Sequence, residues 1–307
     1  MSNLILEVKN LSVLIKERFL VKNISFSLDE GCCLGVLGED QSGKTSLIKA
    51  IGGALPIGEG QVFVDDIDIK ANPVELNSVN LCLDPPMFFK FQSVFDNFKY
   101  LTTLSGNYDK EKIIKILEKF GLSGKISTKV LFLSYYEKKL MALALAFLNK
   151  PKLLLLDEPF KGMTKTSILK IKSYINQLKQ SGTAIIVTSR SFEVLEDFCD
   201  GFIFMEDRSI VKVLTKEECD RLKEGPTYAF VEVKQPNYAG KLVSENFDLK
   251  VKLYENKVLF DANEDETAKI VRFLSKNQIE IYKAGFFNKK AEKIFANLAP
   301  YFKGEEE

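Results

Sequence analysis

The stretch GEDQSGKTSLIKAIGG, which runs from Gly38 to Gly53, decides the fold of this chain. Four residues separate Gly38 from Gly43, and Lys44 and Thr45 follow at once. The two glycines permit backbone angles that other residues resist, so the loop can curl and point its N–H groups at phosphate oxygens. Lys44 would add a positive charge at the outer phosphates, and Thr45 would offer a hydroxyl group to Mg²⁺. The stretch therefore predicts a loop that binds the phosphates of a nucleotide.

The sequence on either side of this loop supports the prediction. The apolar run CCLGVL, Cys32 to Leu37, precedes it and is typical of a strand covered on both faces. The segment SLIKAIGG after it predicts a helix whose positive dipole end faces the anion. We expect nucleotide contacts from the loop and the start of the helix, namely Gly38, Glu39, Asp40, Gln41, Ser42, Gly43, Lys44, Thr45 and Ser46.

A second motif, LLLLDEPF, ends another buried run with Asp157 and Glu158. A carboxylate at such a place can hold Mg²⁺, and a second one can polarise an attacking water. The simpler interpretation is a strand that leads into an acidic turn. Because the motif comes after a well-formed phosphate loop, we favour the metal and water-activating roles for this pair.

Strand and helix patterns alternate along the first part of the chain, which implies an α/β fold with a parallel sheet. A helical pattern over 167–182 separates apolar, strand-like runs, which are Leu153 to Leu156, Ala184 to Thr188 and Phe202 to Met205. The segments LILEV and QVFVDDIDI alternate apolar and polar residues, so they predict antiparallel strands at one side. Helical periodicity dominates from about 88 to 150, which predicts a helical insertion.

The pattern restarts after Gly225-Pro226, which predicts a second, small domain. Its elements follow the order βαββαβ, which is typical of a ferredoxin-like α+β domain. We therefore expect one domain over 1–222 and another over 223–307.

Composition excludes several classes of function. The 43 basic and 42 acidic residues nearly cancel, which argues against a nucleic-acid partner. Histidine is absent, so chemistry that depends on imidazole is excluded. No apolar run reaches the ~20 residues that a membrane-spanning helix needs, and the first residues do not resemble a signal peptide. The five cysteines show no metal-ligand spacing and suit a reducing cytoplasm.

With both motifs in place, the chain resembles the ATP-binding subunits of ABC transporters over nearly its whole length. The resemblance implies a P-loop NTPase core, ATP and Mg²⁺ as cofactors, and two ATPase domains that face each other across the nucleotides. It makes Asp157 and Thr45 the metal ligands and Glu158 the catalytic glutamate. The segment after 225, including KKAEKIFANL, resembles the small C-terminal domain of several exporter subunits.

The departures from the family's pattern are specific. The signature, usually LSGGQ, reads LSYYE here, and its Ser134 with Glu137 forms a capping-box sequence. Arg190 stands where the family has a histidine, and Asp84 stands at the glutamine that contacts Mg²⁺ or water. The aromatic residue that stacks on adenine falls on Ile15, with Phe19 close by. We expect Ser134, Asp84 and Arg190 still to lie at the nucleotide.

The resemblance implies an exporter subunit that works with separate membrane permease subunits and a second ATP-binding subunit, on the inner face of the membrane. The altered signature and Arg190 favour slow hydrolysis and a heterodimer. The alternative is a regulatory partner that binds ATP without turnover. A ribosome- or DNA-acting ABC protein is disfavoured by the balanced charge, and a P-loop kinase leaves LSYYE and DEP unexplained.

Overall fold

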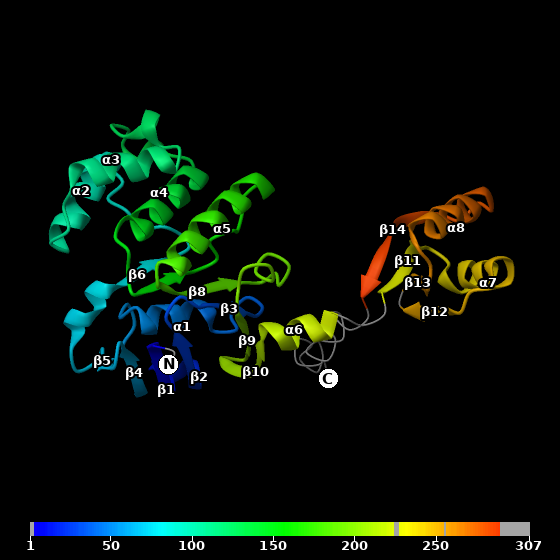
Figure 1. Cartoon of the computed structure of the whole chain (residues 1–307), viewed down its shortest axis with the longest axis horizontal. Helices are drawn as coiled ribbons and strands as arrows, with labels where there is room; N and C mark the ends of the chain where they lie inside the picture. The colour runs from blue at the N-terminus through cyan, green and yellow to red at the C-terminus, as the bar shows by residue number, and fades with distance from the viewer. Residues whose placement is uncertain (1–2, 224–226, 255, 289–307) are drawn as a thin grey trace. The chain divides into compact units, whose positions relative to one another are not determined.

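The computed structural model describes residues 3–223, 227–254 and 256–288 (Figure 1). The chain divides into two compact units, Met1–Lys216 and Glu217–Glu307. The predicted boundary between 222 and 223 falls inside α6 (Lys216–Lys223), close to this division.

The centre of the first unit is a sheet with the strand order β10-β9-β3-β8-β7-β6. Neighbouring strands in this sheet run parallel, except that β10 is antiparallel to β9. The strands are β3 (Cys33–Leu37), β6 (Val79–Cys82), β7 (Leu153–Leu156), β8 (Ala184–Ser189), β9 (Gly201–Glu206) and β10 (Ser209–Thr215). All residues of β3, β7 and β8 are buried, as their apolar runs predict.

An antiparallel sheet forms a second layer, with the order β2-β1-β4-β5. Its strands are β1 (Leu4–Ile15), β2 (Arg18–Asp29), β4 (Glu59–Val64) and β5 (Ile67–Asp68). Helix α1 (Lys44–Ile51) shares one apolar core with both sheets, through buried Leu47, Ile48, Ala50 and Ile51. The phosphate loop is therefore anchored on both sides, by β3 before it and by α1 after it.

The predicted helical insertion is present and lies together at one end of the unit in Figure 1. It contains α2 (Val94–Leu104), α3 (Lys110–Lys119) and α4 (Tyr135–Leu148), with 3₁₀ turns at Ser123–Lys125 and Val130–Phe132. Another 3₁₀ turn, Pro73–Ser78, leads into β6, and α5 (Lys165–Gln180) connects β7 to β8. The fold class is thus confirmed: an α/β core with an antiparallel layer and a helical insertion.

The second unit is the predicted ferredoxin-like α+β domain. Its antiparallel sheet has the order β12-β13-β11-β14, with every neighbouring pair antiparallel. The elements are β11 (Thr227–Val233), α7 (Pro236–Phe247), β12 (Val251–Tyr254), β13 (Lys257–Phe260), α8 (Glu264–Lys276) and β14 (Ile281–Asn288). The two helices pack on the sheet in a core of their own. The segment KKAEKIFANL lies outside the described residues.

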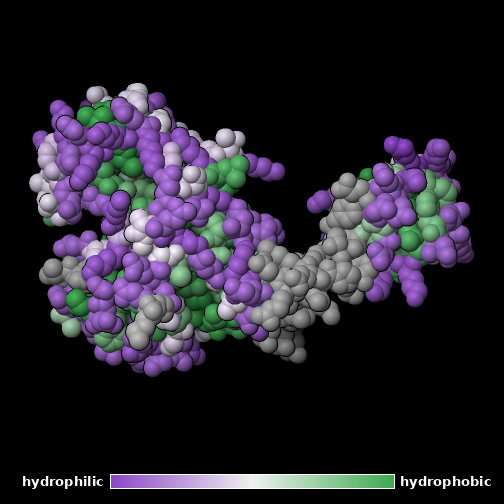
Figure 2. Space-filling model, viewed as in Figure 1, coloured by the Kyte–Doolittle hydropathy of each residue, from purple (hydrophilic) through white to green (hydrophobic). Residues whose placement is uncertain are grey.

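Hydrophilic side chains cover most of the surface in Figure 2, interrupted by apolar patches. Within the described part of the chain, no helix combines the length and the apolar character that crossing a membrane requires. None of the five cysteines, all of which lie within the described residues, forms a disulfide, and burial raises the pKa of Cys82 to about 12.

Candidate nucleotide-binding site

The phosphate loop joins β3 to α1 and depends on its two glycines. Gly43 caps the helix with a φ of 106°, a left-handed conformation that side chains disfavour. A Cβ atom on Gly38 would lie 2.4 Å from the carbonyl oxygen of Met205 and 2.5 Å from Ser42 Oγ. No side chain caps the first turn of α1. The N–H groups there remain available to an anion.

Lys44 is buried and folds back over the loop. Its Nζ atom donates hydrogen bonds to the carbonyl oxygens of Gly38 at 2.6 Å and Glu39 at 2.8 Å. The Glu158 carboxylate lies 4.0 Å away. Burial lowers the pKa of Lys44, and the nearby Glu158 opposes that shift. The loop thus carries a cation whose hydration has been replaced by backbone carbonyls.

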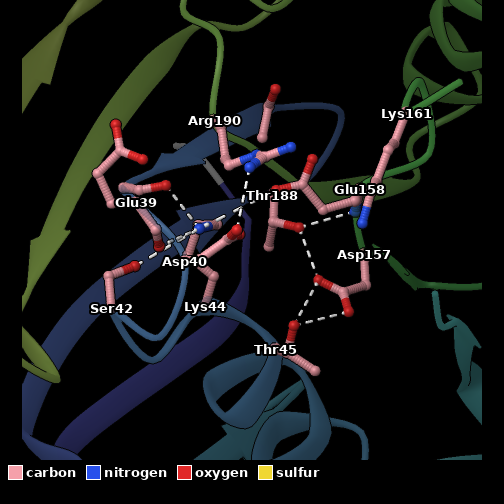
Figure 3. A network of polar contacts seen from close by, with 12 residues as sticks. Glu39, Asp40, Ser42, Lys44, Thr45, Asp157, Glu158, Lys161, Thr188 and Arg190 are labelled. Carbon is pink, nitrogen blue, oxygen red and sulfur yellow. Dashed lines mark hydrogen bonds and ion pairs between the residues drawn. The ribbon is translucent and has the colours of Figure 1, made fainter. Parts of the chain in front are cut away.

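Thr45 and Asp157 meet at the base of the site, as Figure 3 shows. The Thr45 hydroxyl lies 2.8 and 3.1 Å from the two carboxylate oxygens of Asp157. Thr188 on β8 donates to Asp157 Oδ1 at 2.8 Å and accepts from the backbone N–H of Glu158, also at 2.8 Å. Helix α1, through Thr45, and strand β8, through Thr188, therefore hold the two acidic residues that follow β7.

Glu158 begins the turn after β7, with a left-handed φ of 45°. Its side chain is 17% exposed. Burial raises its pKa, while Lys44 lowers it and Asp157 raises it further. A carboxylate in this environment is suited to take a proton from water.

The site is a pocket of about 390 Å³. Ten of the predicted residues line it: Asp40, Gln41, Ser42, Gly43, Lys44, Thr45, Ser46, Asp84, Asp157 and Glu158. Gly38 and Glu39 do not line the pocket but supply the carbonyls that Lys44 binds. Ser134 and Arg190 are also outside the lining.

Arg190 and Ser134 both have partners in their own unit, and the partner of Arg190 is a residue of the pocket lining. Arg190 pairs with Asp40 of the phosphate loop at 3.0 Å, with its side chain 46% exposed. Ser134 caps α4 by accepting a hydrogen bond from the Glu137 N–H. In this single chain, Arg190 adjoins the pocket through Asp40, whereas Ser134 caps α4 away from the pocket lining.

The sequence prediction missed four lining residues: Arg18, Leu20, Lys161 and Arg208. Neither Ile15 nor Phe19 lines the pocket. Arg208 is brought in by backbone hydrogen bonds, because its N–H donates to Ser42 and its carbonyl accepts from Lys22. Nothing local to Arg208 signals this contact, whereas Arg18 and Leu20 flank Phe19, the aromatic residue close to the expected base-stacking position Ile15.

The residues that line the pocket suit the binding of Mg²⁺ and a nucleoside triphosphate. Mg²⁺ usually takes only one or two protein oxygens and completes its shell with phosphate and water. Thr45 and Asp157 are such a pair, and they line the same pocket as Lys44 and the start of α1, which no side chain caps. These residues would hold the metal and the outer phosphates together.

Comparison with known proteins agrees with this geometry. Residues 21–161 match the family described as ABC transporter. The chain is 28% identical over 303 residues to "Uncharacterized ABC transporter ATP-binding protein YhcH" of Bacillus subtilis, covering 98% of both proteins. Residues 21–161 of this chain therefore form an ABC transporter ATP-binding domain.

Other relatives extend the comparison. The "Lipopolysaccharide export system ATP-binding protein LptB" of Escherichia coli is 27% identical over 202 residues, which cover 64% of this chain and 84% of LptB. Further relatives of similar identity are named for import. A solved dimeric cassette in a post-hydrolysis state with ADP and Pi matches with a TM-score of 0.64 at 19% identity, covering 69% of this chain and 98% of that one. That last likeness shows the ABC ATPase fold.

Proposed function

We propose that this ABC ATP-binding subunit binds Mg-ATP at a dimer interface and couples slow hydrolysis to export through separate membrane permease subunits. The second ATP-binding subunit would be a different chain, and the complex would sit on the inner face of the membrane. The observation that carries the proposal is the Thr45–Asp157 contact beside buried Lys44, at the floor of the pocket.

Each residue of the pocket has a role in this proposal. Lys44 and the N–H groups of α1 would bind the outer phosphates, while Thr45 and Asp157 would supply oxygen ligands to Mg²⁺. Bound Mg²⁺ supplies positive charge that offsets the phosphate charge. Glu158 orients the attacking water and takes its proton.

Slow hydrolysis and a heterodimer follow from the signature segment, Leu133–Glu137. In dimers of this family the signature of one subunit approaches the nucleotide of the other. Here Tyr135 and Tyr136 occupy the places of glycines. Their side chains add bulk where the backbone must come close to phosphate. Glu137 adds negative charge in the first turn of α4, where an anion would otherwise be attracted. A second subunit with a glycine signature would complete the better site.

A docking patch, defined as Met87, Phe91, Leu131 and Phe132, supports attachment to a membrane subunit. These side chains are 84%, 67%, 48% and 71% exposed. Backbone hydrogen bonds from Val130 to Gln92 and from Leu131 to Lys90 join the two segments that carry them. Large exposed apolar side chains gathered in this way favour a protein partner. Export is the direction we propose, because the C-terminal segment resembles exporter subunits and LptB is named for export.

Calorimetry with Mg-ATP on the whole chain tests the binding step. Lys44→Ala should abolish the binding heat, since it removes the buried cation at the phosphates. Lys49→Ala, on the same helix but outside the pocket, should bind as wild type. Equal binding by wild type and Lys44→Ala would overturn the proposal.

Glu158→Gln separates binding from turnover. The variant should retain Mg-ATP and lose hydrolysis, because the amide can accept no proton from water. Wild-type turnover should be about 1 s⁻¹ or less for the chain alone. A homodimer with fast turnover would contradict the proposed heterodimer. Transport into or out of inverted vesicles carrying the complex would decide the direction.

A further inference from the structure

Lys139 is a buried cation in the helix that follows the signature. It lies one turn into α4, and its side chain is 3% exposed. Its Nζ atom donates hydrogen bonds to the carbonyl oxygens of Glu158 at 2.6 Å and Lys161 at 3.0 Å. Both acceptors belong to the turn after β7 that carries the catalytic glutamate. The cation therefore joins α4 to the backbone of this turn.

Asp84 balances the charge of Lys139. Its Oδ1 atom lies 3.6 Å from Lys139 Nζ, and its Oδ2 atom lies 3.5 Å from Lys161 Nζ. The Tyr135 hydroxyl donates to Oδ1 as well. The carboxylate is 7% exposed, so these contacts replace most of its hydration. Burial and this hydrogen bond raise the pKa of Tyr135, which keeps its donor proton in place.

The turn has a physical need for such support. The left-handed φ of Glu158 is unfavourable for a residue with a side chain, and surrounding contacts must offset that cost. Within the turn, only weak contacts such as Lys161 N–H to the Glu158 carbonyl at 3.2 Å are local. The charge-assisted bond from Lys139 to the same carbonyl, at 2.6 Å, is shorter and stronger.

We propose that Lys139 is a positioning residue that holds the Glu158 turn against the signature helix, and that Asp84 and Tyr135 serve this cation. The inference rests on the proposed function for the role of Glu158. It assigns Asp84 a place as counter-ion to Lys139, in addition to its place in the pocket lining. It also gives Tyr135 a purpose that glycine at the same position would not have.

The network has a consequence for the two nucleotide sites of a dimer. The N-terminal turn of α4 would face the partner's nucleotide, whereas the Glu158 turn belongs to the subunit's own site. Lys139 links the two by direct hydrogen bonds within one chain. Movement of the signature helix is thereby transmitted to the backbone that aims the catalytic carboxylate.

Lys139→Met tests the proposal, because methionine is also unbranched, is one atom shorter than lysine and carries no charge. Hydrogen–deuterium exchange should rise about tenfold or more over 158–163, since the backbone there loses its support. The phosphate loop should keep its exchange rate, and Mg-ATP should still bind. The kcat for hydrolysis should fall about tenfold or more at little-changed KM. Lys139→Arg, which keeps the charge, should recover part of both losses.

Lys138→Met is the matched control, at the next position of the same helix and only half-buried. It should match wild type in exchange and in turnover. Unchanged exchange over 158–163 in Lys139→Met would overturn the proposal. If Lys139→Met does not fold, Tyr135→Phe decides the question: it should loosen the same turn to a smaller extent, and wild-type exchange would overturn the proposal.

The outcome is separable from that of the proposed function. A wild-type chain that binds no Mg-ATP would remove the proposed function, and the exchange experiment would still measure whether Lys139 holds the turn. A chain that binds and hydrolyses Mg-ATP, with exchange unaffected by Lys139→Met, would remove only the positioning role.

Discussion

Tyr135 and Tyr136 stand in the signature segment, where the resemblance to ABC transporters places two glycines. Both side chains are turned to partners in their own subunit. The Tyr135 hydroxyl donates to Asp84, and the Tyr136 hydroxyl lies 2.8 Å from Ser167 Oγ at the start of α5. The rings remain 47% and 38% exposed. A structural role within the chain thus replaces the close backbone approach that two glycines would allow.

Glycine at these positions should lower the stability of the fold, and its smaller bulk should favour ATP turnover. The double change Tyr135→Gly with Tyr136→Gly should lower the free energy of unfolding by about 2 kcal/mol, because each glycine costs about 1 kcal/mol in a helix. Tyr136→Gly alone should raise ATP turnover by the chain alone, since less bulk would face the partner's phosphate and the Tyr135 hydroxyl that supports the Glu158 turn is kept. Urea unfolding and a steady-state ATPase assay measure the two effects.

Lys170→Gly in α5 provides the matched comparison for that pair. It places one glycine in an exposed helix position far from the signature, so it should cost about 1 kcal/mol and leave turnover unchanged. Turnover that stays at the wild-type rate in Tyr136→Gly would show that the bulk of this tyrosine does not limit hydrolysis.

The N-terminus of helix α4 is stabilised by side chains that also make it a poor binding site for phosphate. Ser134 and Glu137 form a full capping box, in which Glu137 Oε2 accepts the Ser134 N–H at 2.8 Å. This bond, together with Lys125, lowers the pKa of Glu137. The sequence predicts this cap from the spacing of serine and glutamate alone. It satisfies N–H groups that would otherwise be available to an anion.

Removing the cap should destabilise the first unit. Ser134→Ala should lower its free energy of unfolding by about 1 kcal/mol, measured by urea denaturation. Ser173→Ala, at an exposed position within α5, should not destabilise it. A neutral result for Ser134→Ala would mean that the cap contributes nothing to the fold.

The same cap predicts a dependence on pH. Because the folded-state pKa of Glu137 lies below its usual value, its stabilisation is present above the unfolded value and is lost as the pH falls. Glu137→Gln should therefore be less stable than wild type at pH 7, and the difference should shrink as the pH falls below about 4.5. Urea denaturation at several pH values measures this, and a difference that grows on acidification would contradict it.

The segment that joins β6 to α2 carries part of the docking patch. Phe91→Asp should leave folding and Mg-ATP binding intact, because the side chain is 67% exposed. It should reduce co-purification of the ATPase with its membrane subunits and uncouple hydrolysis from transport. Leu169→Asp, which alters a similarly exposed apolar residue on α5, should do neither. Retained transport in Phe91→Asp would place the contact elsewhere.

How much the sequence could predict varies with the range of the contacts involved. Apolar runs such as Leu153–Leu156 predict the buried strands, and the glycine–lysine spacing predicts the loop at Lys44. Strand β6 carries no such signal, because its sequence VNLC is short and contains a polar residue. Arg208 and Lys139 reach the site through hydrogen bonds to distant backbone atoms, which no local pattern encodes.

At the scale of the whole molecule, the two units have separate cores. The pocket is lined by residues of the first unit, and the second unit packs α7 and α8 on its own sheet. The match to the Bacillus subtilis relative nevertheless spans 98% of both chains, so that relative shares both units. Nucleotide binding and the second unit are thus separable in structure.

A chain shortened to residues 1–223 should bind Mg-ATP with nearly the affinity of the full chain, because it retains α6 and the complete pocket. Calorimetry on both chains measures this. The shortened chain with Lys44→Ala should give no heat. A large loss of affinity on shortening would mean that the second unit contributes to the nucleotide site.

The network around Lys139 also predicts how three positions vary together among related genes. A tyrosine at 135, a carboxylate at 84 and a cation at 139 support one another, and losing one leaves the others in an unfavourable setting. Among related genes, these three positions should therefore be inherited as a set. A lineage that regains glycine at 135 should also have changed the carboxylate and the cation.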